Sequence, residues 1–100
     1  MSITNILKGP PMTKYYRSKD GRSLFQFAFA PEGDHIAIHC LAHPPLNGRD
    51  PDPHKTHLFS SGKVCLVAGC EPTDQSRAEE LAGQWAEYFL EYRRTGITQS

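Results

Sequence analysis

Cys65 is the side chain in this sequence whose type and setting best suit nucleophilic chemistry. It follows a turn that ends at Gly62, and it comes eight residues after His57. A thiolate attacks carbonyl carbons, and an imidazole on a neighbouring loop can donate a hydrogen bond to the oxyanion that develops. The pair therefore fits an acyl transfer at sulfur. On spacing alone, a structural role for Cys65 is favoured over this catalytic one.

A zinc site is the second chemistry for which the chain has the necessary ligands. The available nitrogen and sulfur donors are His39, His43, His54, His57, Cys65 and Cys70. Tight zinc sites usually take their ligands in close pairs, such as two cysteines separated by two residues, and the sequence has no such pair. Zinc binding is therefore the third-ranked interpretation, and we expect neither a metal nor a cofactor.

The other two cysteines are expected to be structural. Cys40 alternates with Ile36 and Ile38, which places it on their face of a strand and in the core. Cys70 lies just beyond an apolar run, where a loop is expected. Three cysteines without the spacing of a disulfide scaffold are typical of free thiols in a reducing cytosol.

Composition narrows the classes of partner. Eleven basic residues are balanced by eleven acidic residues, and the basic ones are scattered, which argues against nucleic-acid binding. No apolar run approaches the roughly 20 residues that a membrane span needs, and the first eleven residues have no signal-type apolar region. We therefore expect a cytoplasmic protein that does not associate with membranes.

Alternating side chains predict three strands in the first half of the chain. Residues 14–18 form a short strand that ends at an Asp-Gly turn signal. Residues 24–29 place three phenylalanines on one face, and residues 31–34 have the composition of a turn. Residues 36–40 alternate again, so the last two strands are expected to form a hairpin.

A loop and two short extended segments are expected next. The stretch from Ala42 to Lys55 contains four prolines, which excludes regular structure and predicts a surface loop. Residues 56–59 are expected to resume an extended conformation. Residues 64–68 form an apolar run of strand length, so Cys65 is predicted at a junction of turn and strand.

The C-terminal segment predicts a helix from Ser76 to Arg94, because apolar residues recur there at steps of three and four. Ser76 and Glu79 have the spacing of a capping box, and Gly96 is placed to end the helix. Gly83 lies in the middle of the helix, where glycine costs about 0.5 to 1 kcal/mol relative to alanine. We expect Gly83 to mark a close approach to a strand.

Strands followed by one helix predict an α+β domain, in which an antiparallel meander of three to four strands is backed by the C-terminal helix. Trp85 and Phe89 are expected to pack toward the phenylalanine face of the second strand. The expected organisation is an N-terminal lead over residues 1–12, a single domain over residues 13–96 and a tail over residues 97–100.

Residues 56–66, Thr-His-Leu-Phe-Ser-Ser-Gly-Lys-Val-Cys-Leu, resemble the active-site segment of the ubiquitin-conjugating enzyme superfamily. In that family a His-Pro-Asn tripeptide leads through a glycine turn to a cysteine followed by leucine. His57 stands at the place of the asparagine, Thr56 at that of the proline and Lys55 at that of the histidine. The end of the helix, residues 85–96, is similar to the helix ending in bacterial relatives of these enzymes. The sequence departs from the family in three respects. It shows no counterpart of the N-terminal helix of the family, it lacks the full His-Pro-Asn tripeptide, and its region after the cysteine is shorter.

The resemblance implies a ubiquitin-conjugating-like fold and a function as a cysteine acyl carrier. Cys65 would accept the C-terminus of a ubiquitin-like modifier in thioester linkage, in partnership with an activating enzyme. His57 would replace the asparagine as oxyanion donor, a contribution of roughly 3 to 4 kcal/mol when well placed. A histidine can donate through a ring nitrogen in either protonation state. The alternatives are a non-catalytic protein-interaction module of the same fold and, less favoured, a zinc-binding domain.

Overall fold

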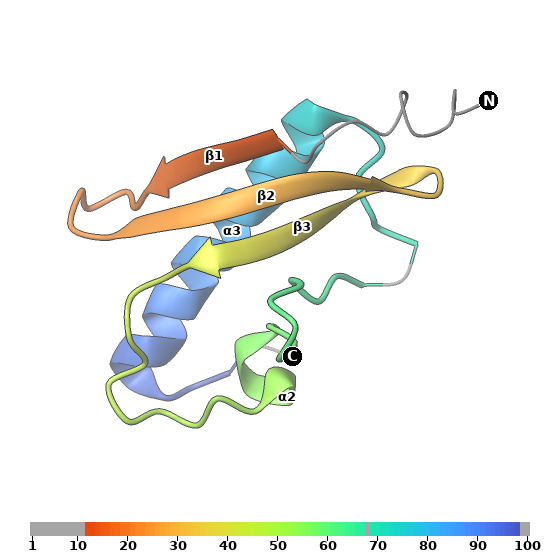
Figure 1. Cartoon of the computed structure of the whole chain (residues 1–100). Coiled ribbons are helices and arrows are strands. Elements are labelled where there is room, and N and C mark those ends of the chain that lie inside the picture. Colours follow the sequence, from red (N-terminus) through yellow and green to blue (C-terminus); the bar gives the residue numbers. More distant parts are fainter. Residues whose placement is uncertain (1–11, 68, 99–100) are drawn as a thin grey trace.

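A three-stranded antiparallel sheet carries one long helix on one of its faces (Figure 1). The computed structural model describes residues 12–67 and 69–98, so most of the predicted lead and the end of the tail lie outside the described residues. The elements in chain order are β1 (Met12–Arg17), β2 (Leu24–Glu32), β3 (His35–Ala42), α2 (Pro53–Thr56) and α3 (Gln75–Thr95). Each strand pairs with the next, in the order β1-β2-β3. The predicted α+β class and the antiparallel meander are confirmed.

The core lies between β2 and α3. Phe25, Phe27 and Phe29 are 0%, 1% and 3% exposed. Trp85 meets Phe25 and Phe27 edge-on, with ring centroids 6.0 and 5.9 Å apart, and Phe89 meets Phe25 in the same way at 5.9 Å. Full burial of one such side chain contributes about 1.5 to 3 kcal/mol, and edge-to-face ring pairs add to it. The predicted packing of the helix on the phenylalanine face is therefore confirmed.

The start of α3 differs from the expectation. Its N-cap is Asp74, whose carboxylate accepts a hydrogen bond from the backbone N–H of Arg77 at 2.8 Å. Ser76 lies inside the first turn, so the predicted capping box with Glu79 is wrong. An aspartate at this position both bonds an unpaired N–H group and places negative charge at the positive end of the helix dipole. Gly96, with φ +74°, ends the helix as predicted.

Gly83 marks the predicted close approach between the helix and a strand. A Cβ atom at this position would lie 3.0 Å from Cε1 of Tyr16, a residue of β1. The Tyr16 hydroxyl donates a 2.5 Å hydrogen bond to the Glu87 carboxylate, one turn further along α3. Glycine at residue 83 therefore lets the edge strand lie directly on the helix.

The proline-rich stretch is not wholly irregular, because it ends in the single turn of α2. Pro53 takes the first helical position, where its missing N–H group is not needed. The Asp52 carboxylate caps the turn by accepting a hydrogen bond from the backbone N–H of His54 at 2.9 Å. Thr56 is the last residue of this helix, so its predicted extended conformation is wrong.

The predicted strand over residues 64–68 is wrong for the part that the structure describes, residues 64–67. Among the described residues of this region, pairing is limited to two single bridges, between His39 and Lys63 and between Leu58 and Val64. The edge of β3 near Ile36 is instead bonded to Pro72, whose carbonyl accepts the Ile36 N–H at 2.8 Å. Since a later segment occupies that part of the edge, the apolar run has no partner strand along which to continue.

Candidate active site

Cys65 and His57 are direct neighbours in a short hairpin. The Cys65 backbone N–H donates to the His57 carbonyl at 2.8 Å, and the Phe59 N–H donates to the Lys63 carbonyl at 2.9 Å. A turn closed by a hydrogen bond from the Gly62 N–H to the Phe59 carbonyl joins the two sides at 2.8 Å. A spacing of eight residues in the sequence thus becomes a backbone pair, which brings the two residues opposite each other across the hairpin.

This hairpin, residues 57–65, is attached to the sheet through the edge of β3. The Val64 N–H donates to the Ile38 carbonyl at 2.8 Å, and the Cys40 N–H donates to the Gly62 carbonyl at 2.7 Å. Gly62 has φ +93°, and a Cβ atom there would lie 3.3 Å from the Cys40 carbonyl oxygen. Only glycine combines this backbone conformation with such a close approach, so residue 62 fixes the hairpin against the sheet.

His57 has a left-handed backbone, with φ +56° and ψ +33°, and it terminates α2. Its N–H donates to the Pro53 carbonyl at 2.8 Å. Its ring lies against Tyr88 of α3, with centroids 5.0 Å apart and planes inclined by 49°. A positive φ is uncommon outside glycine, asparagine, aspartate and histidine. The backbone and the ring of His57 are therefore held from two different sides.

Three aromatic residues of α3 hold the segment that leads to His57. The Trp85 ring N–H donates to the Thr56 carbonyl at 2.9 Å, and the Tyr92 hydroxyl donates to the Asp50 carbonyl at 2.8 Å. The Tyr88 hydroxyl donates to the Lys55 carbonyl. The sequence placed these aromatic residues in the apolar stripe and missed their polar role. The signal was present, because a buried tryptophan or tyrosine usually finds a hydrogen-bond partner for its polar atom.

The three cysteines are free thiols in three different environments. Cys40 is buried as predicted, and burial raises the pKa of its thiol from 9.0 to about 12. Cys70 is exposed in the loop where it was expected. Cys65 is partly buried, between these two extremes. The Cys40 thiol stays protonated at neutral pH, which leaves Cys65 and Cys70 as the accessible sulfur atoms.

The candidate zinc ligands do not form a cluster in the described part of the chain. Among these residues, no three histidine, cysteine, aspartate or glutamate side chains come close enough together to hold a metal ion. His43 packs on the Phe89 ring with centroids 4.8 Å apart, whereas His57 packs on Tyr88. The structure thus pairs the backbones of His57 and Cys65, and in the part of the chain that it describes the donors do not form a metal site.

Two cavities lie in the described part of the chain, and one of them is lined in part by the hairpin that carries Cys65. A cavity of about 850 Å³ lies between the β1–β2 turn and the second half of α3. Another, of about 630 Å³, lies between the end of β3, the proline-rich loop and the hairpin of residues 57–65. Among the residues described, those that line these two cavities do not include Cys65.

No family model, curated protein or solved structure matches this chain. The resemblance to conjugating enzymes therefore rests on the residues that carry it, chiefly 56–66. None of the described helices is both long enough and apolar enough to cross a membrane.

Proposed function

We propose that this protein is a ubiquitin-conjugating-like cysteine acyl carrier, in which Cys65 holds the C-terminal acyl group of a ubiquitin-like modifier as a thioester. The observation that carries the proposal is the backbone pair between Cys65 and His57 at the end of a hairpin, with the thiol partly exposed. A further feature supports it. The element order of meander, cysteine segment and helix agrees with the fold that the resemblance implies.

The reaction is a transfer of an acyl group between two sulfur atoms. The Cys65 thiolate attacks the carbonyl carbon of the modifier, which arrives as a thioester on its activating enzyme. A bond forms between Cys65 Sγ and that carbon, the bond to the donor sulfur breaks, and the donor leaves as a thiolate that takes up a proton. The His57 ring donates a hydrogen bond to the oxyanion of the tetrahedral intermediate, worth roughly 3 to 4 kcal/mol when well placed.

A synthetic donor tests this chemistry without knowledge of the natural partner. The native protein is incubated with a short peptide that carries a C-terminal thioester, and intact mass is measured before and after treatment with dithiothreitol. The proposal predicts one peptide adduct on Cys65 that dithiothreitol removes. Cys65→Ala loses this adduct and Cys70→Ala keeps it.

Cys70 is a demanding control because its thiol is the more exposed of the two. Exchange governed by exposure alone would label Cys70 first. An adduct found mainly on Cys70, or an adduct that survives in Cys65→Ala, contradicts the proposal. The chain would then be assigned to the alternative function, a non-catalytic interaction module.

A further inference from the structure

Lys63 lies on the same side of the hairpin as Cys65. Val64, between them, is 2% exposed and belongs to the core. Because successive side chains of an extended chain point to opposite sides, Lys63 and Cys65 both point away from the core. Two residues of extended chain span about 6.6 Å, a distance that the four-carbon stem of a lysine can cover.

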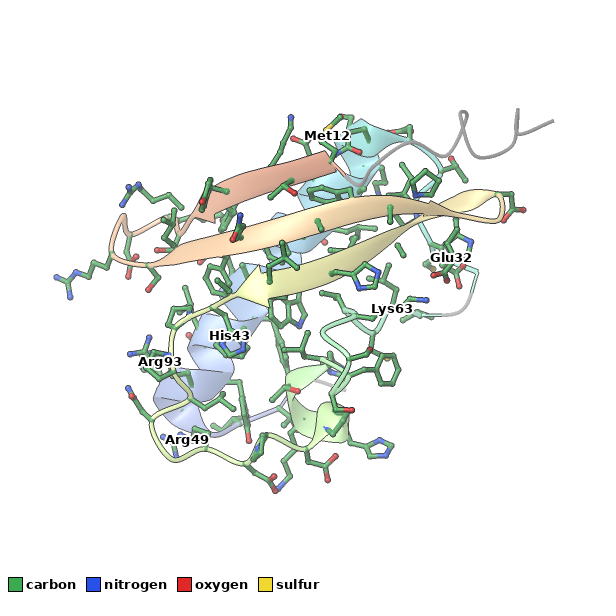
Figure 2. All side chains as sticks on the ribbon, viewed as in Figure 1. Met12, Glu32, His43, Arg49, Lys63 and Arg93 are labelled. Carbon is green, nitrogen blue, oxygen red and sulfur yellow. The ribbon has the colours of Figure 1, made fainter. Side chains whose placement is uncertain are left out.

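The ion pair of Lys63 holds its side chain along the sheet, near the β2–β3 turn. Its Nζ atom lies 2.5 Å from Oε1 of Glu32, the last residue of β2, and Figure 2 shows the two side chains facing each other beside the β2–β3 turn. Lys63 is opposite His39 in an antiparallel bridge, and Glu32 is opposite His35. The chain from Lys63 to Cys65 therefore runs toward the β2–β3 turn. To reach Glu32, the Lys63 side chain extends toward that turn and across β3, so the amine approaches Cys65 only when the ion pair opens.

Glu32 lies on the face of the sheet that points away from α3. The phenylalanines of β2 at odd positions face α3, so even positions such as Glu32 face away from the helix. The hydrogen bond from Lys63 is the main reason why the pKa of the Glu32 carboxyl is lowered. Both side chains remain partly exposed, at 36% for Lys63 and 48% for Glu32. Such a pair opens readily in water.

We infer that Lys63 is an intramolecular acceptor for the acyl group on Cys65, and that the ion pair with Glu32 restrains this transfer. The inference rests on the proposed function, because it requires a thioester at Cys65. When the ion pair opens and the Lys63 amine loses a proton to solvent, the amine attacks the thioester carbonyl. A carbon–nitrogen bond forms, the nitrogen gives up a second proton to solvent, the carbon–sulfur bond breaks, and Cys65 leaves as a thiolate. The product is an amide on Lys63, and it frees Cys65 for another cycle.

The test follows the peptide after it has been loaded onto Cys65. Excess peptide thioester is removed, and the adduct is followed by intact mass with and without dithiothreitol. We expect the adduct to become resistant to dithiothreitol with first-order kinetics that do not depend on protein concentration. Peptide mapping should place the resistant adduct on Lys63.

Three variants separate the roles of these residues. Lys63→Arg keeps a cation for Glu32 but has no nucleophilic amine, so it should load at Cys65 and form no resistant adduct. Glu32→Gln should speed formation of the resistant adduct about two- to five-fold, the effect expected from loss of a surface ion pair. Lys14→Arg is the matched control, since Lys14 is also paired with a glutamate, at 2.9 Å, and it should transfer at the wild-type rate.

The outcomes distinguish the two proposals. A thioester that forms on Cys65 but only hydrolyses, or an amide that maps to another lysine, overturns the role of Lys63 and leaves the acyl carrier intact. A resistant adduct on Lys63 that also forms in Cys65→Ala shows direct acylation and likewise overturns the transfer. Absence of any thioester on Cys65 overturns both proposals.

Discussion

His57 has two properties that substitution can separate, a left-handed backbone and a ring that can donate a hydrogen bond. Glycine adopts φ +56° without strain but supplies no donor, whereas asparagine tolerates this conformation and supplies an amide N–H. We predict that His57→Gly slows the loading of Cys65 by about 10²- to 10³-fold, the usual effect of removing an oxyanion donor. His57→Asn should stay within about tenfold of the wild type. Initial rates of Cys65 loading by the peptide thioester are measured for both variants and for the wild type. Equal rates in the glycine variant and the wild type would exclude His57 as the donor.

Side-chain periodicity predicts the second strand and the C-terminal helix well, because each depends on residues close together in the sequence. The alternation of Phe25, Phe27 and Phe29 and the apolar stripe of α3 each follow from one periodicity, and both elements are present. Gly83 likewise indicates a close approach to a strand, and Tyr16 is the residue it approaches. For α3 the error lay at the end of the element, where two good capping residues competed. Asp74 caps α3 in place of Ser76.

The hairpin of residues 57–65 was beyond local patterns because distant contacts determine it. Its turn depends on Gly62 approaching the Cys40 carbonyl, and its His57 end depends on contacts with Tyr88. The apolar run after Val64 resembles a strand, yet Pro72 occupies the available edge of β3. The spacing and the resemblance single out His57 and Cys65, whose backbones the structure joins and whose catalytic roles stay predictions. The aromatic donors of α3 were recognised only as core.

The packing of α3 on β1 leads to a prediction about Gly83. Alanine would gain about 0.5 to 1 kcal/mol of helix stability but place a Cβ atom 3.0 Å from Tyr16. That ring is restrained by its contact with Phe25 and by its hydrogen bond to Glu87. Overpacking of this kind costs about 1 to 3 kcal/mol, so we predict a net loss of about 1 kcal/mol in Gly83→Ala. Urea denaturation of the variant and the wild type measures this difference in the free energy of unfolding. Gln84→Ala, at an exposed position of the same helix, is the control and should change stability little. A more stable Gly83→Ala variant would contradict the described contact.

Across the whole molecule, the cysteines differ in how far the packed framework shields them. One face of β2 and α3 form the core, and the core buries Cys40 and Val64. Lys63, before Val64, is partly exposed and paired with Glu32, and Cys65, after Val64, is only partly buried. The same framework therefore shields the Cys40 thiol more than that of Cys65. We propose that Cys65, the less shielded of the two, is the nucleophile.

Site-resolved alkylation of the wild-type protein tests that claim most directly. Labelling rates of Cys40, Cys65 and Cys70 are measured by peptide mapping at neutral pH, in the native state and in urea. We predict that native Cys65 reacts faster than Cys70 although it is less exposed, and that the difference disappears on unfolding. Cys40, whose pKa is raised to about 12 by burial, should react only in urea. If Cys65 is also labelled only after unfolding, it is not the nucleophile, and the acyl-carrier function is wrong.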